Sequence, residues 1–213
     1  LVNQLDNLLA DPEAGLSPVF DRFFSAVQDV ADDPTAASAR NVLLAESRIL
    51  AQRFQQIDEQ LVGIEDAINS RLRDAVTEIN TLATGIADVN DQIRLNQSID
   101  PNSQPNDMLD DRDELLRQLA EQVSVSVSEQ GDGTVNVAIG SGQPLVVGTE
   151  VIGLGTAKNE YDPLRVEIAQ ADVPGQPVIS KFLTGGRVGG LLEARSDLID
   201  DSRNILGRLA TTF

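Results

Sequence analysis

The chain lacks two of the residue types on which most catalytic and metal sites depend: its 213 residues include no cysteine and no histidine. Without cysteine there is no disulfide, thiolate metal site or cysteine nucleophile. Without histidine the commonest general base and the commonest transition-metal ligand are missing. Aspartate and glutamate occur throughout, so spacing alone nominates no acid and base pair. We therefore expect no catalytic residue, no metal, no cofactor and no enzyme activity.

Basic residues and long apolar runs are also scarce. The chain has 16 lysines and arginines against 34 aspartates and glutamates, a net charge of -18, which repels phosphate backbones and anionic membranes. No apolar run approaches the roughly 20 residues that span a bilayer. We expect no nucleic-acid partner and no membrane partner. The hydrophobic share of 41% is nevertheless enough for a sizeable core in a chain of this length.

Helical patterns fill most of the first 122 residues. Apolar residues at positions 2, 5, 8 and 9 share one helical face. A second helix is predicted from Ser17-Pro18, an N-cap followed by a proline in the first turn. Its apolar residues are Phe20, Phe23, Phe24, Val27 and Val30. We expect the three phenylalanines to be buried within this chain rather than to form a groove for a partner.

The third helical segment runs from Thr35 to about Ser98 without a proline. From residue 54 onward its apolar residues recur at spacings of three and four with one stutter, as in a coiled coil. This stripe consists of Phe54, Ile57, Leu61, Ile64, Ile68, Leu72, Ala75, Ile79, Leu82, Ile86, Val89 and Ile93. Gly63 and Gly85 each cost about 1 kcal/mol relative to alanine, but we predict one continuous helix.

A helix of this length, about 90 Å, cannot bury its stripe against itself. The stripe has to pack on the short flanking helices, on a returning C-terminal helix or on neighbouring subunits. Fibrous assemblies use such helices routinely, whereas globular enzymes seldom do.

A polar loop at residues 100–105 precedes a fourth predicted helix, which begins at Asn106 or Asp107 and ends near Gln122. Its opening is rich in aspartate, which suits the positive end of the helix dipole. The acidic cluster lacks the glycine-containing loop of an EF-hand, which argues against a calcium site.

Between residues 123 and 183 the pattern changes to strands. Valine alternates with serine over 123–128, and apolar residues alternate again over 135–139 after the turn at 131–133, which predicts a half-buried β-hairpin. Further strands are predicted at 145–147, 151–154, 164–168 and 178–182. From Thr184 the helical period returns.

Together these segments predict an α+β, mainly α fold: an elongated helical bundle with one very long helix, interrupted by a small antiparallel β-domain. The predicted domains are the N-terminal part of a helical rod domain at 1–122, a β-rich inserted domain at 123–183, and the returning helix of the helical domain at 184–213. The insertion should project from the helical body.

A glycine-rich run, Gly185-Gly186-Arg187-Val188-Gly189-Gly190, is superficially similar to a phosphate-binding loop. It lacks the lysine and hydroxyl residue that end a P-loop, and its spacing differs from the dinucleotide fingerprint. We therefore expect these glycines to allow a tight strand-to-helix turn and close helix packing.

Three stretches together carry a resemblance to a known family. The first is residues 32–40, Asp-Asp-Pro-Thr-Ala-Ala-Ser-Ala-Arg, before the long helix. The second covers 80–93 and continues into 105–116, with Met108 where leucine is usual. The third covers 185–196 and 204–210, with Ser196 replacing a frequent aspartate. In this order, over nearly the whole chain, they resemble the flagellar hook-associated protein 1 family.

The resemblance implies a central fragment, lacking both termini, of a structural protein at the junction between hook and filament. It also implies an extracellular protein of the bacterial flagellum, exported by the flagellar type III apparatus without a cleaved signal peptide. The implied partners are further copies in a ring, the hook protein and the second junction protein, and an export chaperone that binds a C-terminal segment outside this sequence.

The family motifs imply packing residues rather than catalytic ones. These are Asn106, Asp107, Leu109, Asp110, Arg112, Asp113, Gly189, Gly190, Leu191 and Arg195. Arg112 could pair with acidic neighbours in its own domain or in another subunit.

Three alternatives stay open. One is the coiled-coil sensing or adhesin module of another bacterial surface protein, which would be flanked by membrane or anchoring segments. Another is a carboxylate-based hydrolase or calcium-dependent enzyme, which would bind a divalent metal tightly. The third is a different flagellar axial protein, either flagellin or the second junction protein.

Overall fold

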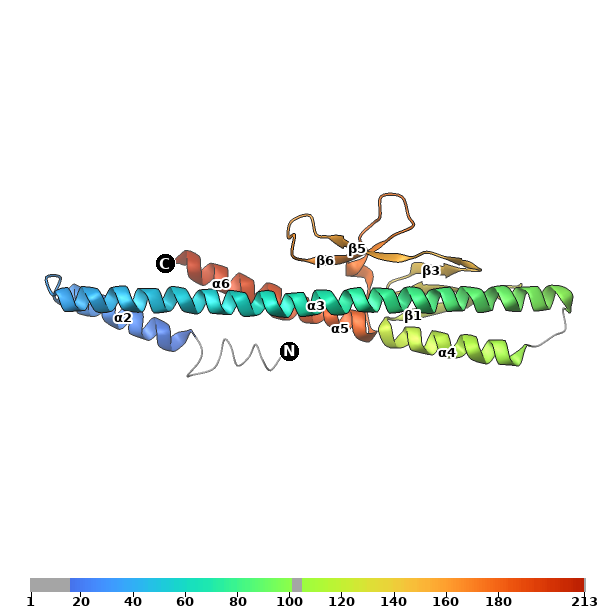
Figure 1. Cartoon of the computed structure of the whole chain (residues 1–213), viewed down its shortest axis with the longest axis horizontal. Helices are drawn as coiled ribbons and strands as arrows, with labels where there is room; N and C mark the ends of the chain where they lie inside the picture. Colours follow the sequence, from blue (N-terminus) through green and yellow to red (C-terminus); the bar gives the residue numbers. More distant parts are fainter. Residues whose placement is uncertain (1–15, 101–104, 213) are drawn as a thin grey trace. The chain divides into compact units, whose positions relative to one another are not determined.

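The structure is a computed structural model that describes residues 16–100 and 105–212. The predicted helix at residues 2–9 lies outside the described residues. The elements in chain order (Figure 1) are α2 (Ser17–Asp32), α3 (Ala37–Ile99), α4 (Asn106–Gln122), β1 (Val125–Glu129), β2 (Val135–Ile139), β3 (Gln143–Val147), β4 (Glu150–Val151), β5 (Leu154–Lys158), β6 (Val166–Gln170), η1 (Ser180–Phe182), α5 (Gly186–Ala194), η2 (Arg195–Asp200) and α6 (Asp201–Thr212). The predicted mainly α fold with antiparallel strands is confirmed.

The chain divides into two compact units. Unit 1 comprises residues 1–65 and 194–213, and unit 2 comprises residues 66–193. The long helix α3 therefore contributes to both units. The division of the chain at residues 122/123 and 183/184 into a rod, an insertion and a returning helix follows the changes of secondary structure and stays a prediction.

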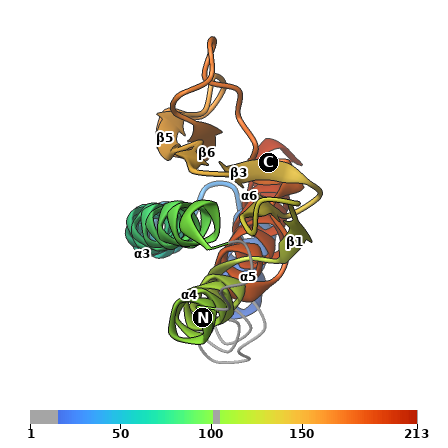
Figure 2. The ribbon, with the colours of Figure 1, turned by 90° about the vertical axis from the view of Figure 1, so that its right-hand side faces the viewer.

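The prediction of one long helix is confirmed. Helix α3 has 63 residues, a length of about 95 Å, and it continues through Gly63 and Gly85. A methyl group on Gly85 would lie 3.3 Å from Leu115 Cδ1 of α4, so the missing side chain lets α3 and α4 approach closely within unit 2. Figure 2 shows α4 beside α3.

The apolar stripe of α3 is covered by the chain itself. Nine of its members are buried, namely Ile57, Leu61, Ile68, Leu72, Ala75, Ile79, Leu82, Ile86 and Ile93, and the other three are half-buried. Because this burial is found in a single chain, the stripe needs no neighbouring subunit to cover it. The sequence left open whether the stripe packs on flanking helices, on a returning helix or on neighbouring subunits. Contacts within the chain are sufficient to bury it.

The core of unit 1 forms where α2, α3 and α6 meet. Its buried members are Leu16, Ile57, Leu61 and Leu206, with Phe20, Phe54, Ile64, Leu198 and Leu209 packed around them. The expectation that all three phenylalanines of α2 are buried is wrong, because Phe24 is 52% exposed and contacts the rings of Phe20 and Phe23 instead.

The physical reason lies in the orientation of α2. Its buried line runs through Leu16, Val19 and Ala26, and at 100° per residue Phe24 lies well outside that line. The start of the helix also differs from the prediction, since the N-cap position is Leu16 and no side chain caps it. Ser17 is the first helical residue instead.

The strands of unit 2 form two antiparallel sheets. One has four strands in the order β1-β2-β3-β4 and the other pairs β5 with β6. The predicted hairpin is present, with Val127 opposite Val137. In β2 three of the five residues are buried and the other two are partly buried, whereas most of β1 is exposed. Val123, expected in that strand, is the C-cap of α4.

Two strand predictions need correction. The segment 151–154 is not one strand, because β4 ends at Val151 and β5 begins at Leu154. The segment 178–182 forms a single bridge, between Val178 and Ala169, and then the 3-10 helix η1. Pairing stops there because the Ile168 N–H donates to the side chain of Ser180 at 2.8 Å instead of to a further strand.

The returning helical segment is also interrupted. Helix α5 passes into a six-residue π-helix, η2, before α6 begins. A π-turn contains more residues per turn than an α-helix, so a pattern read with one helical period does not reveal it. Of the apolar residues that carry the helical period, Val188, Leu191, Ile199 and Leu206 are buried, whereas Ile205 is 39% exposed.

Candidate functional site

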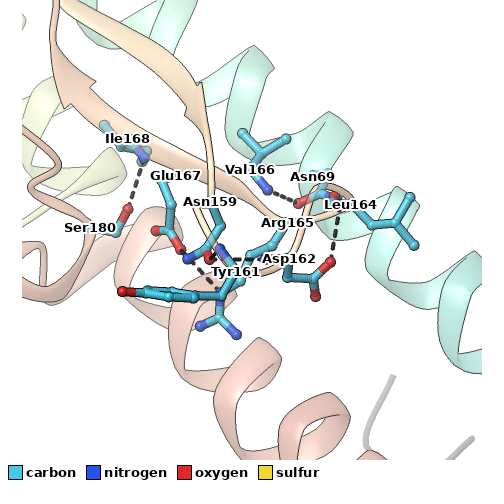
Figure 3. Close-up of polar contacts among 10 residues, drawn as sticks. All are labelled: Asn69, Asn159, Tyr161, Asp162, Leu164, Arg165, Val166, Glu167, Ile168 and Ser180. Atoms are coloured by element: carbon cyan, nitrogen blue, oxygen red, sulfur yellow. Dashed lines mark hydrogen bonds and ion pairs between the residues drawn. The ribbon is translucent and has the colours of Figure 1, made fainter. Parts of the chain in front are cut away.

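Three asparagines along α3 bind the backbone of the β region in unit 2. Asn80 Nδ2 donates to the Leu154 carbonyl oxygen at 2.8 Å, and its Oδ1 accepts from the Leu154 N–H at 2.8 Å. Asn69 binds the Leu164 carbonyl at 2.7 Å and the Val166 N–H at 3.2 Å in the same manner (Figure 3).

Asn90 makes the most contacts of the three. Its Nδ2 donates to the carbonyl oxygens of Val135 at 2.8 Å and Gly148 at 2.6 Å. Its Oδ1 accepts from the Val135 N–H at 3.2 Å. One side chain of α3 therefore holds both β2 and the turn between β3 and β4.

The chemistry of the carboxamide explains this use of asparagine. The group presents a donor and an acceptor side by side, as the edge of a peptide does, so it can take the place of a neighbouring strand. Asn69 is 1% exposed and Asn90 is fully buried, and buried polar groups need such partners. The long helix thereby fixes where each sheet segment lies along it.

Arg112 of α4 joins the same network. It is 7% exposed, and its Nη1 donates to the Gly133 carbonyl oxygen at 2.8 Å and to Asn90 Oδ1 at 3.4 Å. The oxygens that it contacts are neutral, unlike the acidic neighbours considered from the sequence. Among the described residues, its Nε has no hydrogen-bond partner. Helices α3 and α4 and the turn of the hairpin thus meet at one buried guanidinium.

The hairpin turn beside Arg112 is held by its own aspartate. Asp132 Oδ1 accepts from the Thr134 hydroxyl at 2.7 Å and from the Thr134 N–H at 3.1 Å. These hydrogen bonds favour the charged carboxylate and lower the pKa of Asp132 below its ordinary value. The turn therefore keeps the Gly133 carbonyl in place for Arg112.

The remaining motif residues do not gather at this junction. On α4, Asn106, Asp107, Asp110 and Asp113 are exposed and Leu109 is half-buried. On α5, Leu191 is 8% exposed, and Arg195 of η2, 2% exposed, belongs to unit 1. Only Arg112 joins the asparagine network, and the role of the whole set as packing residues stays a proposal.

The two glycines named from the motif differ in their surroundings. A methyl group on Gly189 would lie 2.7 Å from the Thr184 carbonyl carbon, whereas one on Gly190 would meet nothing within 4 Å. Close packing therefore requires glycine at the first position and not at the second.

Sequence reasoning missed the three asparagines. A usable signal was present, because Asn69, Asn80 and Asn90 each directly follow a residue of the apolar stripe. Asparagine is a poor helix former, so three of them beside the buried face of one helix indicate a specific polar contact.

The described residues contain no group of three or more Asp and Glu side chains arranged to hold a metal ion. Within the same part of the chain, no helix has the length and apolar character needed to cross a membrane.

Comparison with known proteins identifies related chains. The family described as "Flagellar hook-associated protein FlgK helical domain" matches residues 2–213. Flagellar hook-associated protein 1 of Salmonella typhimurium is 34% identical over 100% of this chain and 39% of its own length. The Escherichia coli protein of the same name is 32% identical over the same shares. None of these descriptions names an enzyme.

A solved structure agrees with the sequence comparisons. The flagellar hook junction protein FlgK from Burkholderia pseudomallei is 34% identical and matches with a TM-score of 0.85 over 98% of this chain. That match covers 38% of the Burkholderia chain. The present chain thus spans about two fifths of the length of the Salmonella and Escherichia relatives that it matches.

Proposed function

Because the chain belongs to the family of the flagellar hook-associated protein FlgK helical domain, we propose that it is a structural part of the junction between the flagellar hook and filament. The observation that carries the proposal is the match to a hook junction protein over 98% of the chain at a TM-score of 0.85. The related proteins described above are named as hook-associated protein 1 or hook junction proteins, which favours this assignment over a sensing module, flagellin or the second junction protein.

The geometry suits a part that transmits force. Apolar contacts are non-directional, so a sheet held on a helix by apolar contacts alone can slide along it. Hydrogen bonds are directional and short, and Asn69, Asn80 and Asn90 place paired hydrogen bonds at three points along α3. A load applied to the sheets of unit 2 is therefore passed to the helix without a shift in register.

The finer features of the role are also proposals. We infer a non-enzymatic protein outside the cell, exported without a cleaved signal peptide, whose partners are further copies in a ring, the hook protein and the second junction protein. An export chaperone would bind outside this chain. The acidic surface, with a net charge of -18, supports neither a nucleic-acid nor a membrane partner.

Deletion of the gene tests the proposal. Electron microscopy should show intact hooks without filaments, flagellin should accumulate in the medium, and swimming in soft agar should be lost. Complementation with the full-length wild-type gene is the control and should restore filaments. Normal filaments and normal swimming in the deletion strain would rule out the junction role.

A further inference from the structure

Strand β1 forms one edge of the four-stranded sheet and pairs only with β2. At one end of the hairpin the Gly140 N–H donates to the Ser124 carbonyl oxygen at 2.8 Å. This bond places the even-numbered residues of β1 in the hydrogen-bonded positions that face β2. The odd-numbered residues therefore direct their N–H and C=O groups away from the sheet, where no other part of the described chain bonds to them. They are Val125, Val127 and Glu129.

Nothing in β1 itself protects this edge. Folded proteins usually guard an exposed edge with proline, lysine, a bulge or a covering segment, because unpaired backbone groups attract further strands. The sequence of β1, Val-Ser-Val-Ser-Glu, contains neither proline nor lysine, and its register with β2 is regular. Residues 126–129 are exposed, so both faces of the strand meet solvent. The edge is therefore open to a further strand.

Strand β5 provides a second free edge in unit 2. The Asn159 N–H donates to the Arg165 carbonyl oxygen at 3.0 Å, which shows that the odd-numbered residues of β5 face β6. The even-numbered Thr156 and Lys158 direct their N–H and C=O groups outward. Both residues are exposed, and within the described part of the chain these backbone groups have no hydrogen-bond partner.

The remaining outward positions of the strands in unit 2 are occupied or few. Leu154, the first residue of β5, is held at both polar backbone atoms by Asn80. The outward N–H groups of β6 already donate to other segments; they belong to Val166, Ile168 and Gln170. Strand β4 has only two residues. Among the described strands, β1 and β5 are therefore the edges best suited to pair with another strand.

The two free edges are complementary in charge. Glu129 is the one charged residue of β1, and Lys158 is the one charged residue of β5. Lysine on an edge discourages unspecific pairing, so a strand that pairs with β5 has to bring a negative charge. Strand β1 brings one, whereas two β1 strands or two β5 strands would bring only charges of the same sign together.

An antiparallel register satisfies both edges at once. With Val127 opposite Lys158 and Glu129 opposite Thr156, the free N–H and C=O groups of both β5 residues find partners on β1. Glu129 and Lys158 then lie diagonally across the two strands on the same face, which long side chains can span. A shift by one residue would point the backbone groups of one strand away from the other.

We propose that β1 of one copy of this chain pairs with β5 of a second copy in this register. The contact joins two different surfaces, so it repeats from copy to copy and suits a ring, whereas a contact between identical surfaces stops at a pair. Figure 2, which views the chain along α3, shows β1 and β5 on opposite sides of unit 2. This step rests on the proposed function, because it assumes that copies stand side by side in an assembly.

The overall charge of the chain is consistent with so local a contact. Two copies with a net charge of -18 each repel one another as wholes, so a broad contact between their surfaces is disfavoured. Paired strands depend on short, directional hydrogen bonds and, in this register, on one pair of opposite charges.

Disulfide cross-linking tests the proposal, because the chain has no cysteine of its own. In the proposed register Ser128 lies opposite Ala157, with Cα atoms about 4.5 Å apart, which a disulfide can bridge. The full-length protein with Ser128→Cys and Ala157→Cys, and with any cysteine outside this chain replaced by serine, is expressed in the deletion strain. Its flagella are oxidised and run on a gel without reductant. The expected result is a ladder of linked copies.

Matched variants separate strand pairing from chance collision. Val127→Cys with Ala157→Cys directs the two thiols to opposite faces of the sheet and should give no ladder, and neither should Ser128→Cys or Ala157→Cys alone. Equal ladders from both double variants, or dimers from Ser128→Cys alone, contradict the β1–β5 contact. So does the absence of a ladder in swimming cells that carry Ser128→Cys and Ala157→Cys.

A charge exchange tests the register independently of the fold of any one variant. Added to the cross-linking pair, Glu129→Lys or Lys158→Glu places like charges across the contact and should lower the yield of linked copies by about threefold. The two exchanges together restore opposite charges and should restore the yield. A yield that stays low in the combined variant overturns the register. Swimming of the same cells reports on the junction role, so loss of the ladder in motile cells removes the contact alone.

Discussion

The side chain of Asn90 binds both polar backbone atoms of Val135, donating to its carbonyl oxygen at 2.8 Å and accepting from its N–H at 3.2 Å. Asn90 is fully buried and Val135 is 2% exposed, so water cannot replace either bond when the other partner is removed. The penalty for a buried, unpaired polar group exceeds the net worth of an average hydrogen bond. This pair therefore ties α3 to β2 more firmly than its two bonds would on the surface.

Replacement of Asn90 should show this penalty. Asn90→Ala leaves the N–H of Val135 and the carbonyl oxygens of Val135 and Gly148 without their partner, and we expect a loss of about 3 kcal/mol in the free energy of unfolding. Urea unfolding followed by circular dichroism measures it. Asn96→Ala, at a half-buried position of the same helix, should lose about 0.5 kcal/mol at most; similar losses for both variants would refute the assignment.

Asn90 and Arg112 should be energetically coupled. Both hold the hairpin, through Val135 and Gly133 respectively, and they contact each other at 3.4 Å. In a double-mutant cycle with Asn90→Ala and Arg112→Ala, we expect the combined loss to differ from the sum by at least about 0.5 kcal/mol. Strictly additive losses would show that the two residues act separately.

Removing one or the other partner of the ion pair of unit 1 should lower the stability of the protein by different amounts. Arg203 Nη2 lies 2.7 Å from Glu65 Oε2, and the two side chains are 28% and 2% exposed. Arg203→Met leaves a carboxylate buried without that partner, for which we expect a loss of roughly 3 kcal/mol or more. Glu65→Met should lose less, because the partly exposed guanidinium can reach water. Thermal unfolding of both variants measures the two losses. A larger loss for Glu65→Met than for Arg203→Met would contradict the burial of Glu65.

Replacing two glycines of the glycine-rich run by alanine should change the stability of the protein in opposite directions. Gly186 has a φ of +55°, and a methyl group there would lie 2.5 Å from the Gln122 carbonyl carbon and from the Val123 nitrogen. Gly186→Ala should therefore destabilise the protein by roughly 2 kcal/mol or more. Gly190 lies inside α5 with open space around it, so Gly190→Ala should raise stability by about 0.5 to 1 kcal/mol. Equal melting temperatures for the two variants would refute this distinction.

Acid should weaken the fold through two carboxylates whose pKa values are lowered. Hydrogen bonds from Arg117 and Gln118 lower the pKa of Glu114 from 4.5 to about 2, and Thr134 lowers that of Asp132 below 3.8. A lowered folded-state pKa means that the contribution to stability is complete above the ordinary value and is lost as the pH falls through the folded value. We expect this loss below about pH 4.5.

Thr134→Val isolates the effect at Asp132. The variant lacks the hydroxyl that donates to the carboxylate, so the pKa of Asp132 should rise toward its ordinary value of 3.8, while that of Glu114 should not change. NMR titration of the carboxyl carbons measures both groups. An unchanged pKa of Asp132 would show that the hydroxyl does not act as described.

The long helix could be predicted because its signal is repeated along many turns. Residues 54–93 carry twelve stripe positions, and burial of this stripe outweighs the about 1 kcal/mol that each of Gly63 and Gly85 costs. The π-helix η2 could not be predicted in this way, because it is only six residues long and too few apolar residues lie within it to show a change of helical period. The end of the strand pairing near Ser180 depends on one side-chain hydrogen bond, which no periodicity reveals.

The candidate site was predictable in part. The family motif singled out Arg112, but the sequence could not show that its acceptors are neutral oxygens of Gly133 and Asn90, because these come from segments 21 and 22 residues away. The exposed aspartates of α4 suggested carboxylate partners for Arg112, whereas its acceptors are an uncharged carboxamide oxygen and a backbone carbonyl oxygen. Phe24 was misjudged for a similar reason, since the sequence does not specify which line of α2 faces α3.

The asparagines at positions 69, 80 and 90 must keep a fixed spacing and rotation along one helix to reach their backbone partners. Adding or removing a single residue between any two of them would turn one carboxamide by about 100° around the helix axis and move it by about 1.5 Å, so it would no longer meet its peptide. Substitutions can accumulate along this stretch, but its length cannot drift by one residue without releasing part of the β region. The gene should therefore tolerate single-codon insertions before residue 54 far better than between codons 69 and 90.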